Sequence, residues 1–221
     1  MRHTILAPFE RLPYFTTGGF RQLAGDQVSD DAHARTTLYR WVKAGYLVAL
    51  KKGVYMHARF YERHRQEADF SAMVSAILQP QSYLSLEYVL QAHEILTEIT
   101  YPVTAITPKN TRTITNTLGT FVYRHIQPEL YRGFRLSDVH GIPVAIASPA
   151  KALFDYLYLR PSVGNWIQAN LVEELRLNLG EFTPDDRREF YEYVLTSDPS
   201  KMGGVKMRRI LTNLEKTVWQ P

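Results

Sequence analysis

The stretch that decides the fold is residues 29–57, which read SDDAHARTTLYRWVKAGYLVALKKGVYMH. Its acidic opening suits the start of a helix, where carboxylates accept hydrogen bonds from backbone N–H groups that lack a partner within the helix. Lys43 in the last turn and Gly45 just after it are typical of a helix end. Between these limits, apolar residues at helical spacing predict one buried stripe. The stripe comprises Ala34, Leu38, Trp41 and Val42.

Two short apolar runs follow this helix, at 46–50 and 54–57, and the basic turn Lys51-Lys52-Gly53 joins them. Apolar runs separated by a turn that contains glycine predict a β-hairpin. A helix, a short strand, a basic turn and a second strand form the plan of a winged helix. Before them we expect a first helix within Thr4–Leu12 and a second that a threonine caps and Gly25 ends, with Phe20, Leu23 and Ala24 inward. Residues 1–62 are therefore predicted to form a winged helix-turn-helix domain.

The outer face of the helix near residues 33–43 carries the functional prediction. No acidic residue lies between Asp31 and Glu62, and the hairpin turn is basic as well. Such a helix and turn suit a DNA major groove and its adjacent phosphates. We expect Arg35, Thr36 and Arg40 at base edges, with lysines and backbone N–H groups of the second helix at phosphates. The predicted DNA-binding residues are Thr17, Arg21, His33, Arg35, Thr36, Thr37, Arg40, Lys43, Lys51 and Lys52. The simpler interpretation is a helix face that is only solvated.

The charge distribution agrees with a basic first third. The 221 residues carry a formal net charge of +4, of which residues 1–68 hold +5 and residues 69–221 hold −1. A basic head on a nearly neutral body is typical of a nucleic-acid-binding domain followed by a different kind of domain.

Residues 69–221 predict a second, mixed α+β domain with a small antiparallel sheet flanked by helices. Ser148-Pro149 and Thr183-Pro184 are helix starts, each with a capping residue before a proline at the first helical position. A charged connector, 59–67, precedes this domain. The expected helices are 70–78, one from Ser82 or Ser85 to Leu96 with His93 on its apolar side, 149–160, 166–177, 185–195 and 206–218. The expected strands are 101–107, 111–117, 120–126, 133–136 and 142–147.

Motifs for catalysis or cofactor binding are absent from the sequence. It has no cysteine, no Gly-x-Ser-x-Gly and no phosphate-binding Gly-Lys-Ser/Thr loop. We therefore predict no metal, no cofactor and no enzymatic activity. The alternative is a nucleic-acid-processing enzyme that the winged helix targets, with Asp155, Glu173 and Glu174 as its acids. No signal peptide and no apolar run of ~18 residues is present, so we expect a cytoplasmic protein that does not enter a membrane.

Several segments together resemble one family, the AbiEi antitoxins and transcriptional autoregulators of AbiE-type (type IV) toxin–antitoxin systems. In the first domain the similar residues are 38–47 and 51–55. In the second they are 82–87, 118–126 and 147–156. The segments occur in the same order as in the family, and the resemblance extends from about Phe15 to Leu177.

The resemblance implies functions that spacing alone does not. A protein of this kind binds inverted repeats in double-stranded DNA upstream of its own operon and represses transcription, as a monomer or as a dimer that DNA assists. It also counteracts a toxin that resembles nucleotidyltransferases, without a stable complex with it, and its second domain is implicated in antitoxicity. Arg35, Thr36, Arg40, Lys51 and Lys52 match the position of the family's basic DNA-binding surface.

Overall fold

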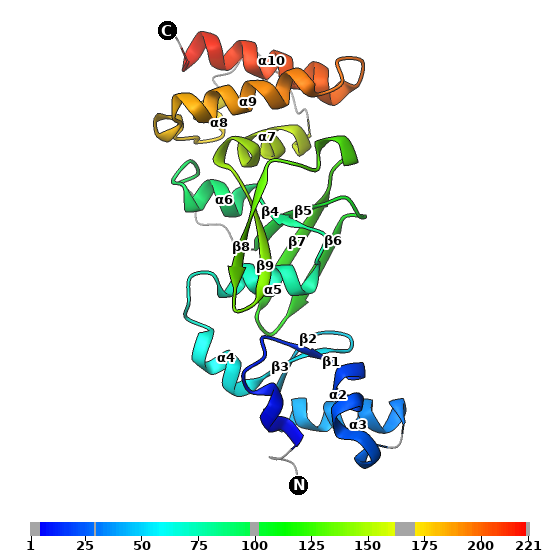
Figure 1. Cartoon of the computed structure of the whole chain (residues 1–221). Helices are drawn as coiled ribbons and strands as arrows, with labels where there is room; N and C mark the ends of the chain where they lie inside the picture. The colour runs from blue at the N-terminus through cyan, green and yellow to red at the C-terminus, as the bar shows by residue number, and fades with distance from the viewer. Residues whose placement is uncertain (1–4, 29, 98–101, 162–170, 220–221) are drawn as a thin grey trace. The chain divides into compact units, whose positions relative to one another are not determined.

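The computed structural model describes residues 5–28, 30–97, 102–161 and 171–219, and it confirms a mixed α+β chain (Figure 1). The chain divides into two compact units. Unit 1 comprises residues 1–80, 113–121 and 138–144, and unit 2 comprises residues 81–112, 122–137 and 145–221. Among the described residues, no helix has the length and apolar character needed to cross a membrane.

Unit 1 begins with helices and a three-stranded antiparallel sheet in the order β1-β3-β2. The β2–β3 turn is Lys52-Gly53, and the register of the two strands shifts between Ala49 and Lys51. In chain order the elements are η1 (Ala7–Phe9), β1 (Phe15–Thr16), α2 (Thr17–Ala24), η2 (Gly25–Gln27), α3 (Asp31–Lys43), β2 (Leu47–Lys51), β3 (Val54–His57), α4 (Ala58–His64) and α5 (Phe70–Leu78).

An aromatic core holds the first elements of unit 1 together. The ring centroids of Phe9 and Phe15 lie 4.2 Å apart with the rings tilted by 33°, and the Phe20 ring meets Trp41 edge to face with centroids 5.4 Å apart. An edge-to-face contact such as that of Phe20 with Trp41 is an arrangement that the ring quadrupoles favour. Through Phe20 of α2 and Trp41 of α3, the core fixes how these two helices pack.

Most of the predicted elements of the N-terminal third are present. Helix α2, helix α3 and the β2–β3 hairpin are confirmed, and Thr16 caps α2 by accepting a hydrogen bond of 3.0 Å from the Gly19 amide. The predicted helix at Thr4–Leu12 is shorter than expected: Ile5 and Leu6 are α-helical, Ala7–Phe9 form a 3₁₀ helix around Pro8, and residues 10–12 are turn or bend, while Thr4 lies outside the described residues. Leu23, predicted to face inward, is 52% exposed.

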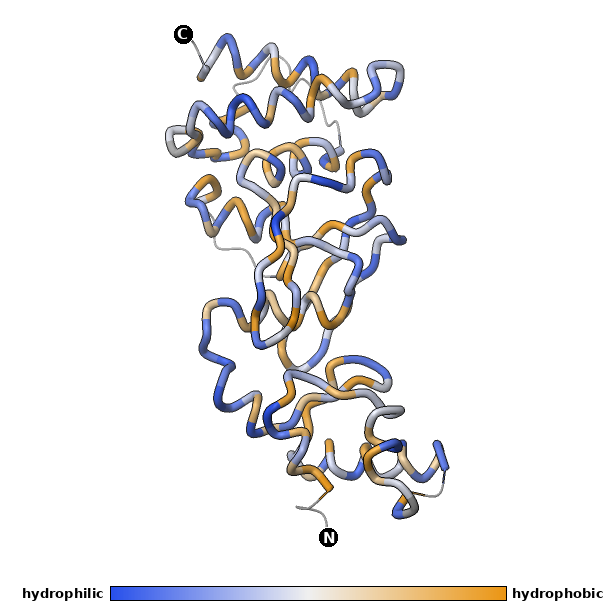
Figure 2. Tube along the Cα trace, in the orientation of Figure 1, coloured by the Kyte–Doolittle hydropathy of each residue, from blue (hydrophilic) through white to orange (hydrophobic). Residues whose placement is uncertain are grey.

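The two units have limits other than the predicted domains 1–62 and 69–221. Helix α5 belongs to unit 1, together with the segments 113–121 and 138–144. The side chain of Asn116 donates a hydrogen bond of 2.9 Å to the carbonyl of Leu50 in β2. All of α4 except its first residue, Ala58, lies in the predicted connector 59–67, and the hydrophilic run that follows α4 is blue in Figure 2.

A six-stranded sheet has the order β6-β7-β5-β4-β9-β8. Strand β4 pairs antiparallel with β5 and parallel with β9, so the sheet is mixed and not purely antiparallel. The strands are β4 (Tyr83–Leu84), β5 (Val103–Thr107), β6 (Arg112–Asn116), β7 (Gly119–His125), β8 (Phe134–Val139) and β9 (Ile142–Ala147).

The helices of unit 2 include α7, α9 and α10, which pack against one another (Figure 1). Ser148 caps α7, and Thr183 with Asp186 forms a capping box at α9, so both predicted helix starts are confirmed. The helical elements are α6 (Glu87–Ala92), η3 (Pro128–Leu130), α7 (Pro149–Leu159), α8 (Leu171–Glu174), η4 (Leu179–Glu181), α9 (Pro184–Thr196) and α10 (Met202–Thr217).

Three predictions in unit 2 need correction. The helix expected from Ser82 or Ser85 begins only at Glu87, because Tyr83 and Leu84 pair as a strand. His93, expected on the apolar side of that helix, is exposed at its end. Helix α10 begins at Met202, four residues before the predicted start. Of the helix predicted at 166–177, residues 166–170 lie outside the described residues.

Candidate nucleic-acid interface

Helix α3 carries most of the predicted interface, and local contacts explain its limits. The Asp30 side chain accepts a hydrogen bond of 2.7 Å from the amide of His33. This bond satisfies one of the first amides of the helix, which have no partner within it. At the other end Gly45 has a φ of 76°, a left-handed conformation that glycine adopts without a steric penalty.

The buried stripe of α3 determines which side chains face outward. Ala34, Leu38 and Trp41 are buried as predicted, and Val42 is half-buried. The remaining positions of the helix lie on the opposite face or on its flanks. Of the predicted DNA-binding residues, the structure exposes Arg21, His33, Arg35, Thr36, Arg40, Lys43 and Lys52, and it half-buries Thr17, Thr37 and Lys51.

Asp31 neutralises part of this basic surface. Its carboxylate forms an ion pair with Arg21 of α2, and its Oδ2 lies 3.8 Å from Nη2 of Arg35. The three side chains are 45–67% exposed, so solvent weakens these attractions. Arg21 nevertheless has a partner within the protein, and a DNA phosphate must compete with Asp31 for it.

The two lysines of the hairpin have different environments. Nζ of Lys51 donates hydrogen bonds of 3.0 Å and 2.7 Å to the carbonyl oxygens of Ile77 and Leu78, at the end of α5. These carbonyls lack partners within the helix, and a cation there also meets the negative end of the helix dipole. Lys52 is exposed. Lys51 thus acts as a cap for α5, a role that its sequence context did not suggest.

The backbone amide of Thr17 also has a partner. It donates a hydrogen bond of 3.0 Å to the carbonyl of Gly53 in the β2–β3 turn. An amide carries one proton, so the predicted phosphate contact through Thr17 N–H is wrong for this arrangement. The same bond connects the start of α2 to the hairpin turn.

Tyr39 is an exposed aromatic residue that was not among the predicted DNA contacts. Its side chain is 61% exposed, and Nζ of Lys43 lies 5.7 Å from the centroid of its ring. The signal was available in the sequence, since Tyr39 lies on the face opposite the apolar stripe. An exposed ring beside basic residues offers an apolar contact for a thymine methyl group.

The alternative catalytic acids do not come together. The carboxylate of Asp155 is completely buried, where it pairs with Lys151 and accepts hydrogen bonds of 2.9 Å from Tyr83 and 2.8 Å from Ser85. Burial raises the pKa of Asp155 and lowers that of Lys151, and the contact between the two groups opposes both shifts. Glu173 and Glu174 are exposed on α8. The contacts of Asp155 are therefore those of a residue that holds the fold together.

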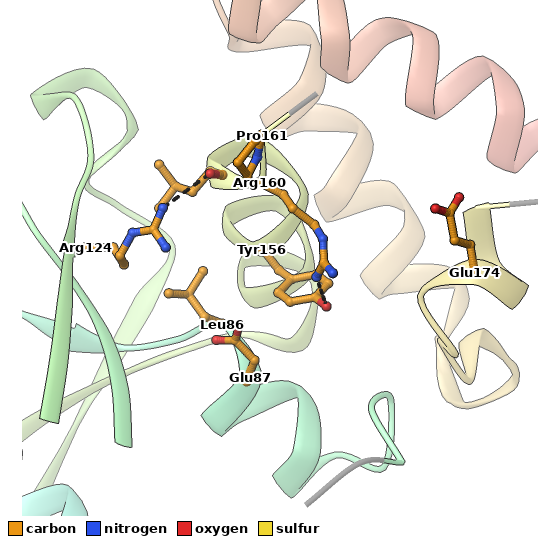
Figure 3. Close-up of a pocket in the computed structure, with 8 residues that line it drawn as sticks. Leu86, Glu87, Arg124, Tyr156, Arg160, Pro161 and Glu174 are labelled. Atoms are coloured by element: carbon orange, nitrogen blue, oxygen red, sulfur yellow. Dashed lines mark hydrogen bonds between the residues drawn. The ribbon is translucent and has the colours of Figure 1, made fainter. Parts of the chain in front are cut away.

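Unit 2 has a cavity of about 530 Å³, and Glu174 is one of the residues that line it (Figure 3). Its described lining residues are Leu86, Glu87, Arg124, Tyr156, Leu159, Arg160, Pro161 and Glu174. Both arginines have protein partners, since Arg124 donates a hydrogen bond of 3.3 Å to the Leu159 carbonyl and Arg160 contacts the Tyr156 hydroxyl. Asp155 does not line the cavity, so it does not join Glu174 there.

The comparisons with known proteins add no family to this description. No family model matches the chain, and a search of curated proteins finds no relative.

Proposed function

We propose that unit 1 binds double-stranded DNA through a winged helix-turn-helix, with α3 as the recognition helix and the β2–β3 hairpin as the wing. One observation carries the proposal. Arg35, Thr36, Arg40 and Lys43 are all exposed on α3, and no acidic residue follows Asp31 until Glu62. A surface of this sign attracts the phosphate backbone, and its arginines suit the acceptors of guanine.

The proposed roles follow from exposure and from the partners within the protein. Arg35, Thr36 and Arg40 contact base edges, with His33 and Thr37 beside them. Lys43 and Lys52 contact phosphates, and Arg21 does so after it leaves Asp31. Lys51 has no place among these contacts, because its amino group caps α5.

The resemblance to the AbiEi antitoxins extends the proposal to the biological role. We propose that the protein represses transcription of its own toxin–antitoxin operon in the cytoplasm, and that it counteracts a nucleotidyltransferase-like toxin without a stable complex. Segments in both predicted domains support this role, because they follow one another in the family's order. Growth of cells that express the toxin of the same operon, with and without this chain, tests the antitoxin part.

Fluorescence anisotropy tests the DNA-binding part. The full chain is titrated into labelled DNA from immediately upstream of its own gene and into a scrambled duplex of equal length, at 50 mM and 200 mM salt. We expect tighter binding to the upstream DNA and weaker binding at the higher salt, because each neutralised phosphate releases a counterion. Equal, weak binding to both duplexes would contradict a sequence-specific repressor.

Three variants locate the interface. Arg40→Ala should reduce both affinity and sequence preference, since a bidentate arginine–guanine contact contributes ~1–3 kcal/mol of discrimination. Lys52→Ala should weaken binding to both duplexes about equally.

Lys51→Ala is the matched control for the hairpin, because it removes the same charge at a position that caps α5. It should lower the thermal stability, whereas Lys52→Ala should not. An Arg40→Ala variant with unchanged affinity and preference would exclude α3 as the recognition helix.

A further inference from the structure

Three side chains of unit 1 that the proposed function does not use form a compact cluster. Glu67 lies between two histidines, with its Oε1 2.6 Å from Nδ1 of His64 and its Oε2 2.7 Å from Nε2 of His140. One nitrogen or oxygen from each residue falls within 4.8 Å of the others. The two imidazole rings are also close to each other, with centroids 4.2 Å apart.

Helix α4 and the chain after it present two members of the cluster. His64 is the last residue of α4, and Glu67 follows three positions later. The amide of Glu67 donates a hydrogen bond of 3.0 Å to the His64 carbonyl, so the chain turns back at this point. This turn places both side chains on the same side.

The two-residue β8–β9 turn presents the third member under backbone strain. His140 has a φ of 53° and Gly141 a φ of 79°, which is the pattern of a type I′ turn. Asn, Asp or Gly is usual at the first of these positions, and other residues are disfavoured by roughly 1–2 kcal/mol. A histidine that adopts this conformation, and whose ring meets two further potential ligands, suggests a use for the imidazole.

The Phe60 ring covers one side of the cluster, and the other side is exposed to solvent. The centroid of the Phe60 ring lies 4.3 Å from that of His64 and 5.5 Å from that of His140, which it meets edge to face. The three side chains are 14%, 41% and 31% exposed for His64, Glu67 and His140. A ligand in solution can therefore reach the cluster from one side while Phe60 restricts the rings from the other.

We propose that His64, Glu67 and His140 form a binding site for Zn²⁺, with Nδ1 of His64, Nε2 of His140 and one Glu67 oxygen as ligands. Two imidazoles and one carboxylate are a ligand set that zinc accepts, with a fourth position left for water. Tetrahedral bonds of about 2.0–2.1 Å separate neighbouring ligand atoms by roughly 3.3 Å, so the cluster needs only small side-chain rotations. Mg²⁺ and Ca²⁺ prefer oxygen ligands and suit this set poorly.

The ionisation of Glu67 agrees with a role as a metal ligand. Hydrogen bonds from His140 and His64 hold the pKa of this carboxyl below its usual value, so it is a carboxylate at neutral pH. A bound ion would replace the protons that now lie between the rings and the carboxylate. It would also connect the end of α4 to the β8–β9 turn within unit 1.

Isothermal titration calorimetry of the full chain tests the site without DNA, so its result is independent of the proposed function. The protein is treated with EDTA, dialysed and titrated with ZnCl₂ or MgCl₂. We expect one zinc ion per chain and no binding of Mg²⁺. Co²⁺ added in place of zinc should give visible d–d absorption, which reports ligation directly.

The variants are chosen to preserve the fold. His140→Asn suits the left-handed turn position, Glu67→Gln changes an exposed side chain, and each should weaken zinc binding at least about tenfold and remove the cobalt absorption. His93→Asn changes an exposed histidine elsewhere and should bind zinc like the unmodified protein. Circular dichroism checks that each variant is folded. Absence of zinc binding by the unmodified chain, or undiminished binding by the doubly substituted His140→Asn/Glu67→Gln protein, would overturn the proposal.

Discussion

At the scale of single residues, Asp31 limits the charge that the proposed interface presents. Its carboxylate pairs with Arg21 and lies 3.8 Å from Arg35, on the same face that would meet DNA. We predict that Asp31→Asn increases DNA affinity by about five- to tenfold, or roughly 1 kcal/mol, because it releases both arginines and removes a charge that repels phosphates. Anisotropy at two salt concentrations measures the change, and the variant should also show a steeper salt dependence.

The neighbouring residue provides the control for that prediction. Asp30→Asn removes the same charge one position earlier, and asparagine keeps the helix cap that Asp30 provides. Asp30 forms no ion pair with an arginine among the described residues. Its substitution should therefore improve affinity less than Asp31→Asn. An equal improvement in both variants would mean that only net charge matters and that Arg21 and Arg35 do not contact DNA.

For the two hairpin lysines, the sequence predicted the turn but not the partner of each side chain. Lys51 and Lys52 are identical neighbours in a basic turn, and the turn itself was predictable from Gly53 and the flanking apolar runs. The partner of Lys51 lies 26 residues further along the chain, at the carbonyl of Ile77. No local pattern indicates such a contact, because it depends on the packing of α5 beside β2. The same holds for the cluster proposed to bind zinc, whose members Glu67 and His140 lie 73 residues apart.

At the scale of elements, the sequence predicted the helix starts, because these depend on contacts between residues only a few positions apart. Helices α3, α7 and α9 begin at capping residues that the sequence displays, since Asp30, Ser148 and Thr183 each accept a hydrogen bond from an amide three positions later. Strand β4 was missed for the opposite reason. Its two residues become a strand only by pairing with β5 and β9, and Leu84 pairs with Ile146 far along the chain. Propensity and periodicity over two residues carry no such information.

The buried ion pair of α7 gives a prediction at this scale. Lys151 and Asp155 are four residues apart on the helix, and both side chains are fully buried. Lys151→Met should destabilise the protein by about 3–5 kcal/mol, because it leaves Asp155 as an uncompensated buried charge. Lys151→Met/Asp155→Leu should recover part of this loss. Recovery should be incomplete, since the hydroxyls of Tyr83 and Ser85 then lose the acceptor to which they donate.

Urea denaturation measures these changes in the free energy of unfolding. An exposed pair on α9 serves as the control, in which Arg188 donates a hydrogen bond of 2.6 Å to Asp185 and both side chains are more than 70% exposed. Arg188→Met should change stability by no more than about 0.5 kcal/mol. A Lys151→Met variant as stable as Arg188→Met would show that Asp155 becomes neutral at little cost, and that the pair contributes little.

At the scale of the whole molecule, the pattern of expected helices and strands predicted the mixed α+β class and the charge count predicted a basic N-terminal third, but neither predicted the limits of the two units. The expected boundary followed the change from charged connector to apolar helix near Asp69. Unit 1 instead includes α5, whose residues are almost all buried, and the segments 113–121 and 138–144. Contacts such as that between Asn116 and Leu50 bring these distant segments to unit 1. Boundaries drawn from composition along the chain miss units assembled from separate segments.

The proposed repressor implies a geometry for its operator that whole-protein binding can test. Two copies that read an inverted repeat from one face of B-DNA contact half-sites about 34 Å, or roughly 10 base pairs, apart. We predict that inserting five base pairs between the half-sites weakens binding of the second copy about tenfold, because it moves one half-site to the opposite face of the duplex. An insertion of ten base pairs returns it to the same face and should restore part of the cooperativity. Anisotropy titrations with a single half-site give the reference affinity. If all three spacings bind two copies with that reference affinity, the copies bind independently, and repression must arise from occupancy of separate half-sites.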